Sequence, residues 1–315
     1  MIIPNALIPN NLKIQRMPIG QVWPIFKRML ALLREHSTFW TPIVRMVFVN
    51  IITFFVFLIS IGYFCDDKIK IGAILLGVSA LLYLLRSFYF GYLFGMLSAM
   101  VYLYLHGNEI SVKNAKYIIR QRVLSLGLLH ILANTLGGFF KKKQKQNTNA
   151  TPSFIPKALV DSISMEAVDI FGHFLVPVIV IENENLTDSL KHLQKIPQHL
   201  SATLSGAIGV NMTRTILSLL FIPFSIAILF GCALIAKYCV NFLPQATLLN
   251  LGTQTYSWLP PAIGILFLFF ITSFLKPCME CLKIIYFTLL YALMAHPEKI
   301  QPEKRALFTG LTDKH

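Results

Sequence analysis

The sequence has few charged residues. They make up 13% of its 315 positions, whereas soluble domains carry about 25%. Hydrophobic residues make up 55% of the chain, and the mean hydropathy is +0.64. Long uncharged runs account for the shortage of charge, and such runs are typical of membrane-spanning helices. This composition excludes an ordinary water-soluble enzyme.

Acidic residues are scarcer than basic ones. There are 14 of them against 28 lysines and arginines, which gives a formal net charge of +14. On a soluble protein this excess would suggest binding to nucleic acid. Here the basic residues lie between the apolar runs, as expected for loops that face an anionic membrane surface. We therefore expect membrane lipids as partners and no nucleic acid.

Cysteine shows no disulfide pattern, and the motifs of soluble catalysis are missing. Five cysteines without framework spacing argue against a disulfide scaffold. Cys278 and Cys281 form a C-x-x-C, but no second pair completes a zinc site. We interpret both as small buried residues, with metal or redox chemistry as the alternative. Without a phosphate-binding glycine loop, a zinc-protease motif or a nucleophile elbow, we expect no enzyme activity and no cofactor.

Six apolar segments are predicted to cross the membrane as helices, so the expected fold class is an all-α polytopic helix bundle. A run of roughly 20 apolar residues crosses the roughly 30 Å hydrocarbon layer. The predicted spans are residues 46–65, 71–105, 123–140, 164–182, 205–236 and 258–295. They form a transmembrane domain, 46–295, between an N-terminal interfacial segment, 1–45, and a C-terminal cytoplasmic tail, 296–315. Residues 237–257 are expected to be a loop.

Two spans leave alternatives open. As one helix, residues 71–105 exceed the bilayer by about 20 Å. They either project from the membrane or break near Arg86, and the lack of a proline or paired glycine there favours one long helix. Residues 123–140 either cross the membrane or dip into it and return. The second alternative arises because the basic cluster 141–145 would otherwise lie on the less basic side.

The distribution of basic residues predicts the orientation. With six spans, 16 lysines and arginines lie on the side of both termini and 8 on the other. Because cytoplasmic loops carry the excess of basic residues, both termini are predicted to be cytoplasmic. We expect a bacterial inner membrane as the host.

Three amphipathic segments are predicted to lie in the membrane interface, namely residues 20–40, 108–122 and 184–199. Two of them share a pattern. NEISVKNAKYI (108–118) and NENLTDSLKHL (183–193) align without gaps at an offset of 75, and each follows an apolar span. Asn185 or Thr187 can cap the second helix. The two units are either a duplicated hairpin, as in many transport folds, or a chance similarity of two amphipathic helices.

The order of these segments resembles a known pattern. It runs from a basic amphipathic N-terminus with tryptophan, through a span after Pro42 and an aromatic span, to HGNEISVKNAKYIIRQR, FLVPVIVIENENLTDSLKHLQK and LLYALMAHPEK. Over residues 20–300 it resembles an uncharacterised family of multi-pass bacterial membrane proteins, although KKKQKQNTNATPS is not part of that pattern. The resemblance implies six spans and a cytoplasmic C-terminus, and no reaction. A fainter likeness, over residues 258–300, is to the C-terminal half of choline-transporter-like proteins.

Ionisable and amide side chains inside the predicted spans are the candidate functional residues, because burying them in hydrocarbon is costly. The proposed pathway residues are Arg86, His130, Asn134, His173, Glu182, Asn211, Arg214, Lys276 and Glu280. A cavity that they line would suit a small polar or anionic solute or a lipid headgroup.

Structural pairing is the alternative role for these residues. On one helix, Glu280 is spaced to pair with Lys276 and Lys283. Arg86 can extend to the interface or pair with Glu166 or Asp169. His130 and His173 either relay protons or bond to neighbouring carbonyl groups.

The sequence therefore favours transport, or permeation through a channel, of a small solute or lipid headgroup. The side chains expected to line the cavity most closely are Arg86, His130, His173, Arg214 and Lys276. The alternative is a membrane scaffold or lipid-remodelling factor that works through the three interfacial helices. A pathway requires the charges to face a shared solvated gap, whereas a scaffold would leave them paired in a dry interior.

A small-residue face on the second span permits close approach of another helix. Gly91 and Gly95 are four residues apart and so lie on one side of a helix. This face serves either folding of the chain or a homo-oligomer.

Overall fold

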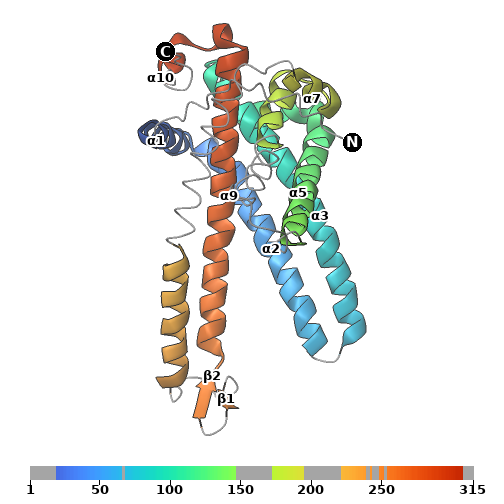
Figure 1. Cartoon of the computed structure of the whole chain (residues 1–315), viewed down its shortest axis with the longest axis vertical. Helices are drawn as coiled ribbons and strands as arrows, with labels where there is room; N and C mark the ends of the chain where they lie inside the picture. Colours follow the sequence, from blue (N-terminus) through green and yellow to red (C-terminus); the bar gives the residue numbers. More distant parts are fainter. Residues whose placement is uncertain are drawn as a thin grey trace. The chain divides into compact units, whose positions relative to one another are not determined.

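The computed structural model describes residues 19–65, 68–146, 172–194, 221–238, 242, 248–251 and 254–307. These residues are almost all helical, which confirms the all-α fold class (Figure 1). The chain separates into two compact units, Met1–Val210 with Glu280–His315, and Asn211–Met279.

The first unit contains most of the helices. It begins with α1 (Ile19–Glu35), a 3-10 helix (Ser37–Phe39), α2 (Trp40–Cys65) and α3 (Ile69–Leu105). There follow α4 (Val112–Ile119), a 3-10 turn (Arg120–Arg122), α5 (Val123–Gln146), the helix Gly172–Ile181 and α7 (Leu186–Gln194). The C-terminal part of α9 (Leu259–Ala295), a 3-10 helix (Pro297–Lys299) and α10 (Pro302–Leu307) complete it.

The second unit corrects one prediction. Besides the helix Phe221–Tyr238 and the first part of α9, it holds an antiparallel pair of strands, β1 (Leu248–Leu251) and β2 (Gln254–Ser257). Residues 237–257 are therefore not entirely a loop. The strands are separated by Gly252 and Thr253, and a two-residue connection that begins with glycine favours a hairpin.

The N-terminal segment is broken at His36. The backbone of this residue is extended, with φ −119° and ψ 93°, so α1 ends at Glu35 and α2 begins already at Trp40. The indole Nε1 of Trp40 donates a hydrogen bond of 2.9 Å to the carbonyl of Leu33. This bond satisfies one of the carbonyl groups that the end of α1 leaves without a helical partner.

Four helices in the described ranges are long and apolar enough to cross a membrane: Ser37–Phe64, Ile69–Leu105, Phe221–Tyr238 and Leu259–Ala295. They correspond to the first, second, fifth and sixth predicted spans. The third predicted span lies in α5, and the described part of the fourth is the short helix Gly172–Ile181. For residues 71–105 the alternatives were one long helix or a break near Arg86. α3 runs without a break, so the structure has the single long helix.

The environment of α3 changes at Arg86. Before it, apolar side chains are exposed, with Ile74 at 67% and Leu84 at 57%. Beyond it, from Phe90 to Leu105, most of the helix is buried, and Leu93 and Met96 are fully enclosed. α2, which packs beside α3 as an antiparallel hairpin, exposes apolar side chains from Val44 to Phe64 (Figure 1).

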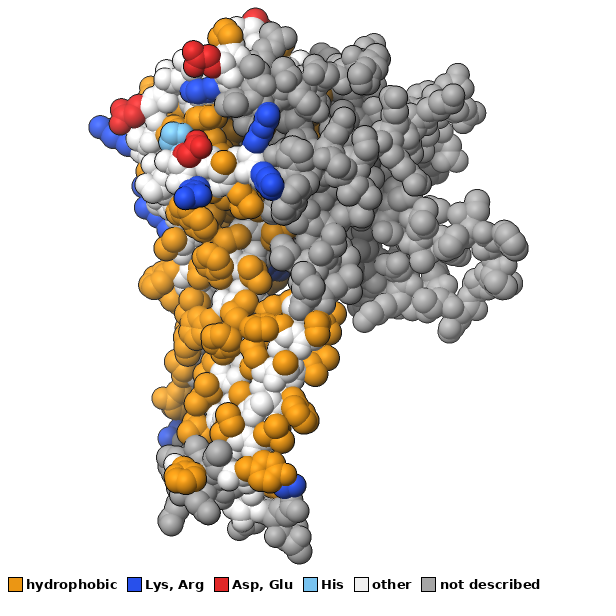
Figure 2. Space-filling view, turned by 90° about the vertical axis from the view of Figure 1, so that its left-hand side faces the viewer, with side chains coloured by type: hydrophobic (Ala, Val, Ile, Leu, Met, Phe, Trp, Pro, Cys, Tyr) orange, Lys and Arg blue, Asp and Glu red, His pale blue; other side chains and the backbone are white. Residues whose placement is uncertain are grey.

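Aromatic and basic side chains lie at both ends of the exposed part of this hairpin. The Lys68 ammonium is 5.8 Å from the ring centroid of Tyr63, and the Arg86 guanidinium is 5.1 Å from that of Tyr83. Between Lys68 and Arg86 the helix rises about 27 Å at 1.5 Å per residue, close to the roughly 30 Å of hydrocarbon. Figure 2 shows many exposed hydrophobic side chains on the described part of one face of the protein.

Small residues let α3 and α5 approach closely. A Cβ at Gly91 would collide with the backbone of Leu126, and one at Gly95 with the side chain of Leu126. Gly127 in turn has no room for a Cβ because Phe88 covers it. The small-residue face is therefore occupied by α5 of the same chain. Of its two predicted uses, folding of the chain or a homo-oligomer, the structure contains the first.

Both predicted elbows occur as helix, turn and short amphipathic helix. Gly107 has φ +72°, and the N–H groups of Gly107 and Asn108 donate to the carbonyls of Tyr104 and Leu103, which ends α3 in a Schellman motif. In the second elbow, Asn183 follows the helix Gly172–Ile181 and has φ +52°. The two turn residues are 76 positions apart and the starts of α4 and α7 are 74 apart, one position on either side of the predicted offset of 75.

Candidate functional site

The predicted pathway residues are distributed over several separate contacts. Asn211 and Arg214 lie outside the described residues, as do Glu166 and Asp169. Lys276 is exposed on the part of α9 that belongs to the second unit. The remaining ones belong to the first unit.

His173, Glu280 and Lys283 form one cluster. Nε2 of His173 is 2.9 Å from Oε2 of Glu280, and the ammonium of Lys283 is 3.6 Å from the same oxygen. Lys283 is 2% exposed. A buried ammonium needs a carboxylate close by, because an uncompensated charge is costly to remove from water. The helical pairing predicted for Glu280 and Lys283 is thus present, and His173 adds a partner from another helix.

The other predicted histidine lies against aromatic rings. His130 has ring centroids 5.1 Å from Phe94 and 6.2 Å from Phe90. His173 also contacts Phe94, at 6.1 Å, so the two histidines share one aromatic neighbour.

Asn134 and Arg86 also have local partners. Asn134 donates from Nδ2 to Oγ of Ser87, at 3.0 Å. The Arg86 guanidinium lies over the rings of Tyr83 and Phe90, at 5.1 and 5.2 Å from their centroids. Aromatic faces attract a guanidinium, so these two rings stabilise Arg86 at the end of the exposed apolar surface, where the described residues give it no carboxylate partner.

Glu182 is the centre of a second cluster that the sequence did not reveal. The hydroxyl of Tyr291 donates to Oε1 of Glu182 at 2.6 Å, and Nε2 of His296 is 2.7 Å from the same atom. Nδ1 of His296 is also 3.7 Å from Oε1 of Glu298. Tyr291 and His296 follow Glu182 by 109 and 114 positions, and no local spacing signals such pairs.

Arg122 binds the second elbow. Its guanidinium donates to the side-chain oxygens of Asn183 and Asn185 and to the carbonyl of Asn183. Asn185 precedes α7, and its carbonyl accepts the N–H of Ser189 at 2.9 Å. Two asparagines after the fourth predicted span therefore receive a basic side chain from the end of the first elbow unit.

The C-terminal segment packs on the first elbow. The N–H of Gln301 donates to the carbonyl of Leu105 at 3.1 Å, and a Cβ at Gly107 would collide with the Gln301 side chain. The ammonium of Lys304 donates to the carbonyl of Tyr104 and lies 4.4 Å from its ring centroid. Partial burial lowers the pKa of Lys304, and nearby Glu303 acts in the opposite direction.

The cysteines of the C-x-x-C are both reduced. Cys281 is buried, and its sulfur lies 4.0 Å from that of Met46, whereas Cys278 is partly exposed. Within the described ranges, no group of three or more His, Cys, Asp and Glu side chains could hold a metal ion.

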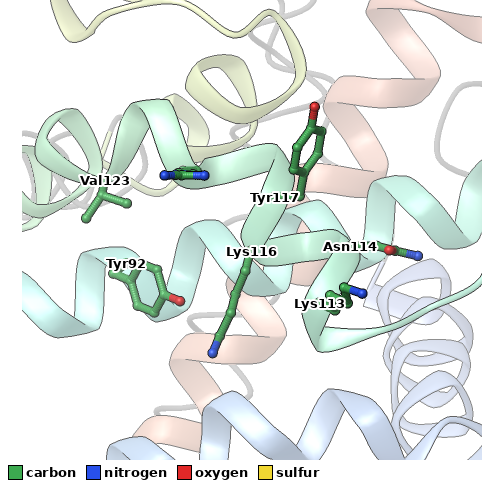
Figure 3. A pocket seen from close by; sticks show the side chains of 7 residues that line it. Tyr92, Lys113, Asn114, Lys116, Tyr117 and Val123 are labelled. Atoms are coloured by element: carbon green, nitrogen blue, oxygen red, sulfur yellow. The ribbon is translucent and has the colours of Figure 1, made fainter.

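A pocket of about 520 Å³ lies beside α4, and none of the predicted pathway residues lines it (Figure 3). Tyr92 comes from α3, and the other side chains come from α4 and the residues after it. The lining residues are Tyr92, Lys113, Asn114, Lys116, Tyr117, Arg120 and Val123. Among the described residues that line it, three are cations and none is acidic.

The local sequence explains why these cations lie together. Oγ of Ser111 caps α4 by accepting the N–H of Asn114 at 3.1 Å. Ala115 and Ile119 are buried against the unit, which turns Lys113, Lys116 and Arg120 outward. The sequence predicted an amphipathic helix here, and the three-residue and four-residue spacings already placed the basic side chains on one face.

No protein-family model, curated protein or solved structure matches the chain. Both resemblances described for the sequence therefore stay predictions.

Proposed function

We propose that this multi-pass membrane protein acts at the membrane surface, as a scaffold or lipid-remodelling factor that engages lipid through its interfacial helices. The proposal involves no catalytic step. The sequence favoured transport and left a scaffold or lipid-remodelling role as the alternative. We prefer that alternative.

The observation that carries the proposal is the position of α4. Leu85 is the last residue of α3 with an exposed large apolar side chain. Tyr92 lies about two turns further along α3, beside the basic face of α4. A hydrocarbon layer around the exposed part of the α2–α3 hairpin would end near Arg86. α4 would then lie at the depth of the lipid headgroups.

The pairing of the charged side chains that the sequence placed in the spans supports the same proposal. Glu280 is engaged by His173 and Lys283, and Glu182 by Tyr291 and His296. Such pairing is expected of a packed interior rather than of side chains arranged around a solvated gap. Basic residues on α4 also suit the cytoplasmic leaflet, which is rich in anionic lipid, in agreement with the proposed cytoplasmic termini and six spans.

Hydrogen exchange in nanodiscs tests this proposal. The full chain is reconstituted in phosphatidylcholine alone and in phosphatidylcholine with phosphatidylglycerol, and amide exchange is followed over residues 112–122. We expect slower exchange in the anionic bilayer because lipid contacts would hold α4 in place. Equal exchange in both bilayers would contradict a surface role for this helix.

Transport is a second candidate, favoured by one observation. His173, Glu280 and Lys283 put three ionisable groups within one cluster on apolar helices, and such groups often mark ion pathways. Solute flux into liposomes that is lost in Glu280→Gln, with the protein still folded, would support it. If neither the wild type nor the Glu280→Gln variant shows solute flux, transport is no longer a candidate.

A further inference from the structure

We propose that the pocket beside α4 binds the phosphate of an anionic phospholipid headgroup. This inference rests on the proposed function and names the ligand of the surface. The pocket residues are Tyr92, Lys113, Asn114, Lys116, Tyr117, Arg120 and Val123.

The charges of the pocket are not balanced. Lys113, Lys116 and Arg120 are all exposed, and none has an ion-pair partner among the residues that the structure describes. Arg45 of α2 does not line the pocket, but its charge also acts on Tyr92. Like charges around one hollow repel one another, so an anion bound there would relieve the repulsion.

The hydrogen-bond donors suit a phosphate. Lysine ammonium groups and an arginine guanidinium form short, strong bonds with phosphate oxygens. The side chains of Tyr92, Tyr117 and Asn114 also line the hollow and carry donors. A volume of about 520 Å³ exceeds that of a bare phosphate and leaves room for the polar group esterified to it.

The depth of the pocket favours a lipid over a soluble ligand. Tyr92 lies about 10 Å along α3 beyond Leu85, at the outer edge of a headgroup layer that extends roughly 5–8 Å beyond the hydrocarbon, so the long basic side chains beside it can reach the headgroups. Tyr117 is 81% exposed and Leu124 67% exposed, although both flank the basic residues. Aromatic and apolar side chains beside basic ones are typical of surfaces that rest on a bilayer.

A charge-neutralising variant tests the site. In Lys113→Gln/Lys116→Gln/Arg120→Gln the pocket loses its three cations. The control, Lys70→Gln/Lys237→Gln/Lys299→Gln, removes the same charge from exposed positions outside the pocket and outside the three interfacial helices. Detergent-solubilised full-length protein is titrated with short-chain phosphatidylglycerol, and bound lipid is counted by native mass spectrometry.

We expect weaker lipid binding in the pocket variant only. Each basic residue near an anionic surface contributes about fivefold in affinity, so three should give a loss on the order of a hundredfold. Equal losses in the two variants would overturn the site and leave only non-specific attraction. Since all six side chains are exposed, circular dichroism and gel filtration should show both variants folded.

A second titration separates the two sources of phosphate. Inorganic phosphate and glycerol phosphate are added to the wild-type protein in place of the lipid. Weak or no binding of these soluble anions supports the lipid assignment. Soluble phosphate that binds as tightly as the lipid would overturn it.

The nanodisc experiment distinguishes this inference from the proposed function. Anionic lipid that still slows exchange of α4 in the pocket variant would refute the pocket while the surface role remains. If anionic lipid does not slow exchange in the wild type, the surface role itself fails.

Discussion

At the scale of single residues, the interior of the first unit is organised by a few polar contacts between helices. Oγ1 of Thr288 and Oγ of Ser98 share a hydrogen bond of 2.9 Å, and Tyr291, one turn further along α9, donates to Glu182. Each bond joins residues more than 100 positions apart. They specify which faces of equally apolar helices meet, because a mismatch would leave a buried polar group without a partner.

Two tyrosines on α9 allow this idea to be tested. Tyr291 donates to a carboxylate, whereas the buried hydroxyl of Tyr286 has no hydrogen-bond partner in the described part of the chain. We expect Tyr291→Phe to destabilise the protein by about 2 kcal/mol, since bonds to charged groups contribute roughly that much. Tyr286→Phe should be neutral or stabilising. Thermal unfolding in detergent measures both.

The comparison is informative because the two substitutions are chemically identical. Both delete one oxygen from an enclosed ring on the same helix. If Tyr286→Phe were as damaging as Tyr291→Phe, general packing rather than the bond to Glu182 would explain the loss.

At the scale of elements, the sequence predicted the helices better than their surroundings. The continuous α3 followed from the lack of a proline or paired glycine around Arg86, and the position of α4 from its amphipathic pattern. The change from exposed to buried within α3 was not predictable. Both parts of α3 are apolar, and lipid-facing and protein-facing surfaces are both built from apolar residues, so hydropathy does not show which part is enclosed by protein.

The candidate site could be only partly predicted from the sequence for the same reason. Side chains such as Glu280 and Lys283 are neighbours on one helix, and their pairing followed from spacing. The partners of Glu182 come from the far end of the chain, and only the tertiary fold brings them together. The pocket was not predicted because its basic residues have the pattern of a solvent-exposed helix face. Only the tertiary fold places Tyr92 of α3 beside them.

The first elbow provides a prediction at this scale. Gly107 adopts φ +72°, where an alanine costs roughly 1–2 kcal/mol, and Gln301 leaves no room for a Cβ. We expect Gly107→Ala to lower stability by at least that amount and to loosen the C-terminal segment. Limited proteolysis after residue 296, together with thermal unfolding, would measure both effects.

Gly77 is the matched control for this change. It lies inside α3, and nothing in the described structure lies within 4 Å of the place where its Cβ would be. Gly77→Ala should stabilise the helix by about 0.5–1 kcal/mol. A destabilisation equal to that of Gly107→Ala would mean that the elbow has no special backbone requirement.

At the scale of the whole molecule, the central question is which solvent surrounds the exposed apolar residues. Ile69 and Ile74 are both on α3, with exposed fractions of 64% and 67%. In water, a lysine at either position would be harmless. In a bilayer, Ile69 lies next to Lys68 and Lys70 at the end of the helix, whereas Ile74 lies a turn and a half deeper.

The two positions should therefore respond differently to lysine. A charge within the hydrocarbon part of a span costs up to about 3 kcal/mol, whereas a lysine at the interface can reach the headgroups. We expect Ile74→Lys to reduce membrane insertion, measured as protein that resists alkaline extraction, and Ile69→Lys to insert like the wild type. If Ile74→Lys is inserted normally, or if the wild type is extracted as a folded monomer without detergent, these helices do not face lipid. In that case the depth assigned to α4 and its pocket loses its basis.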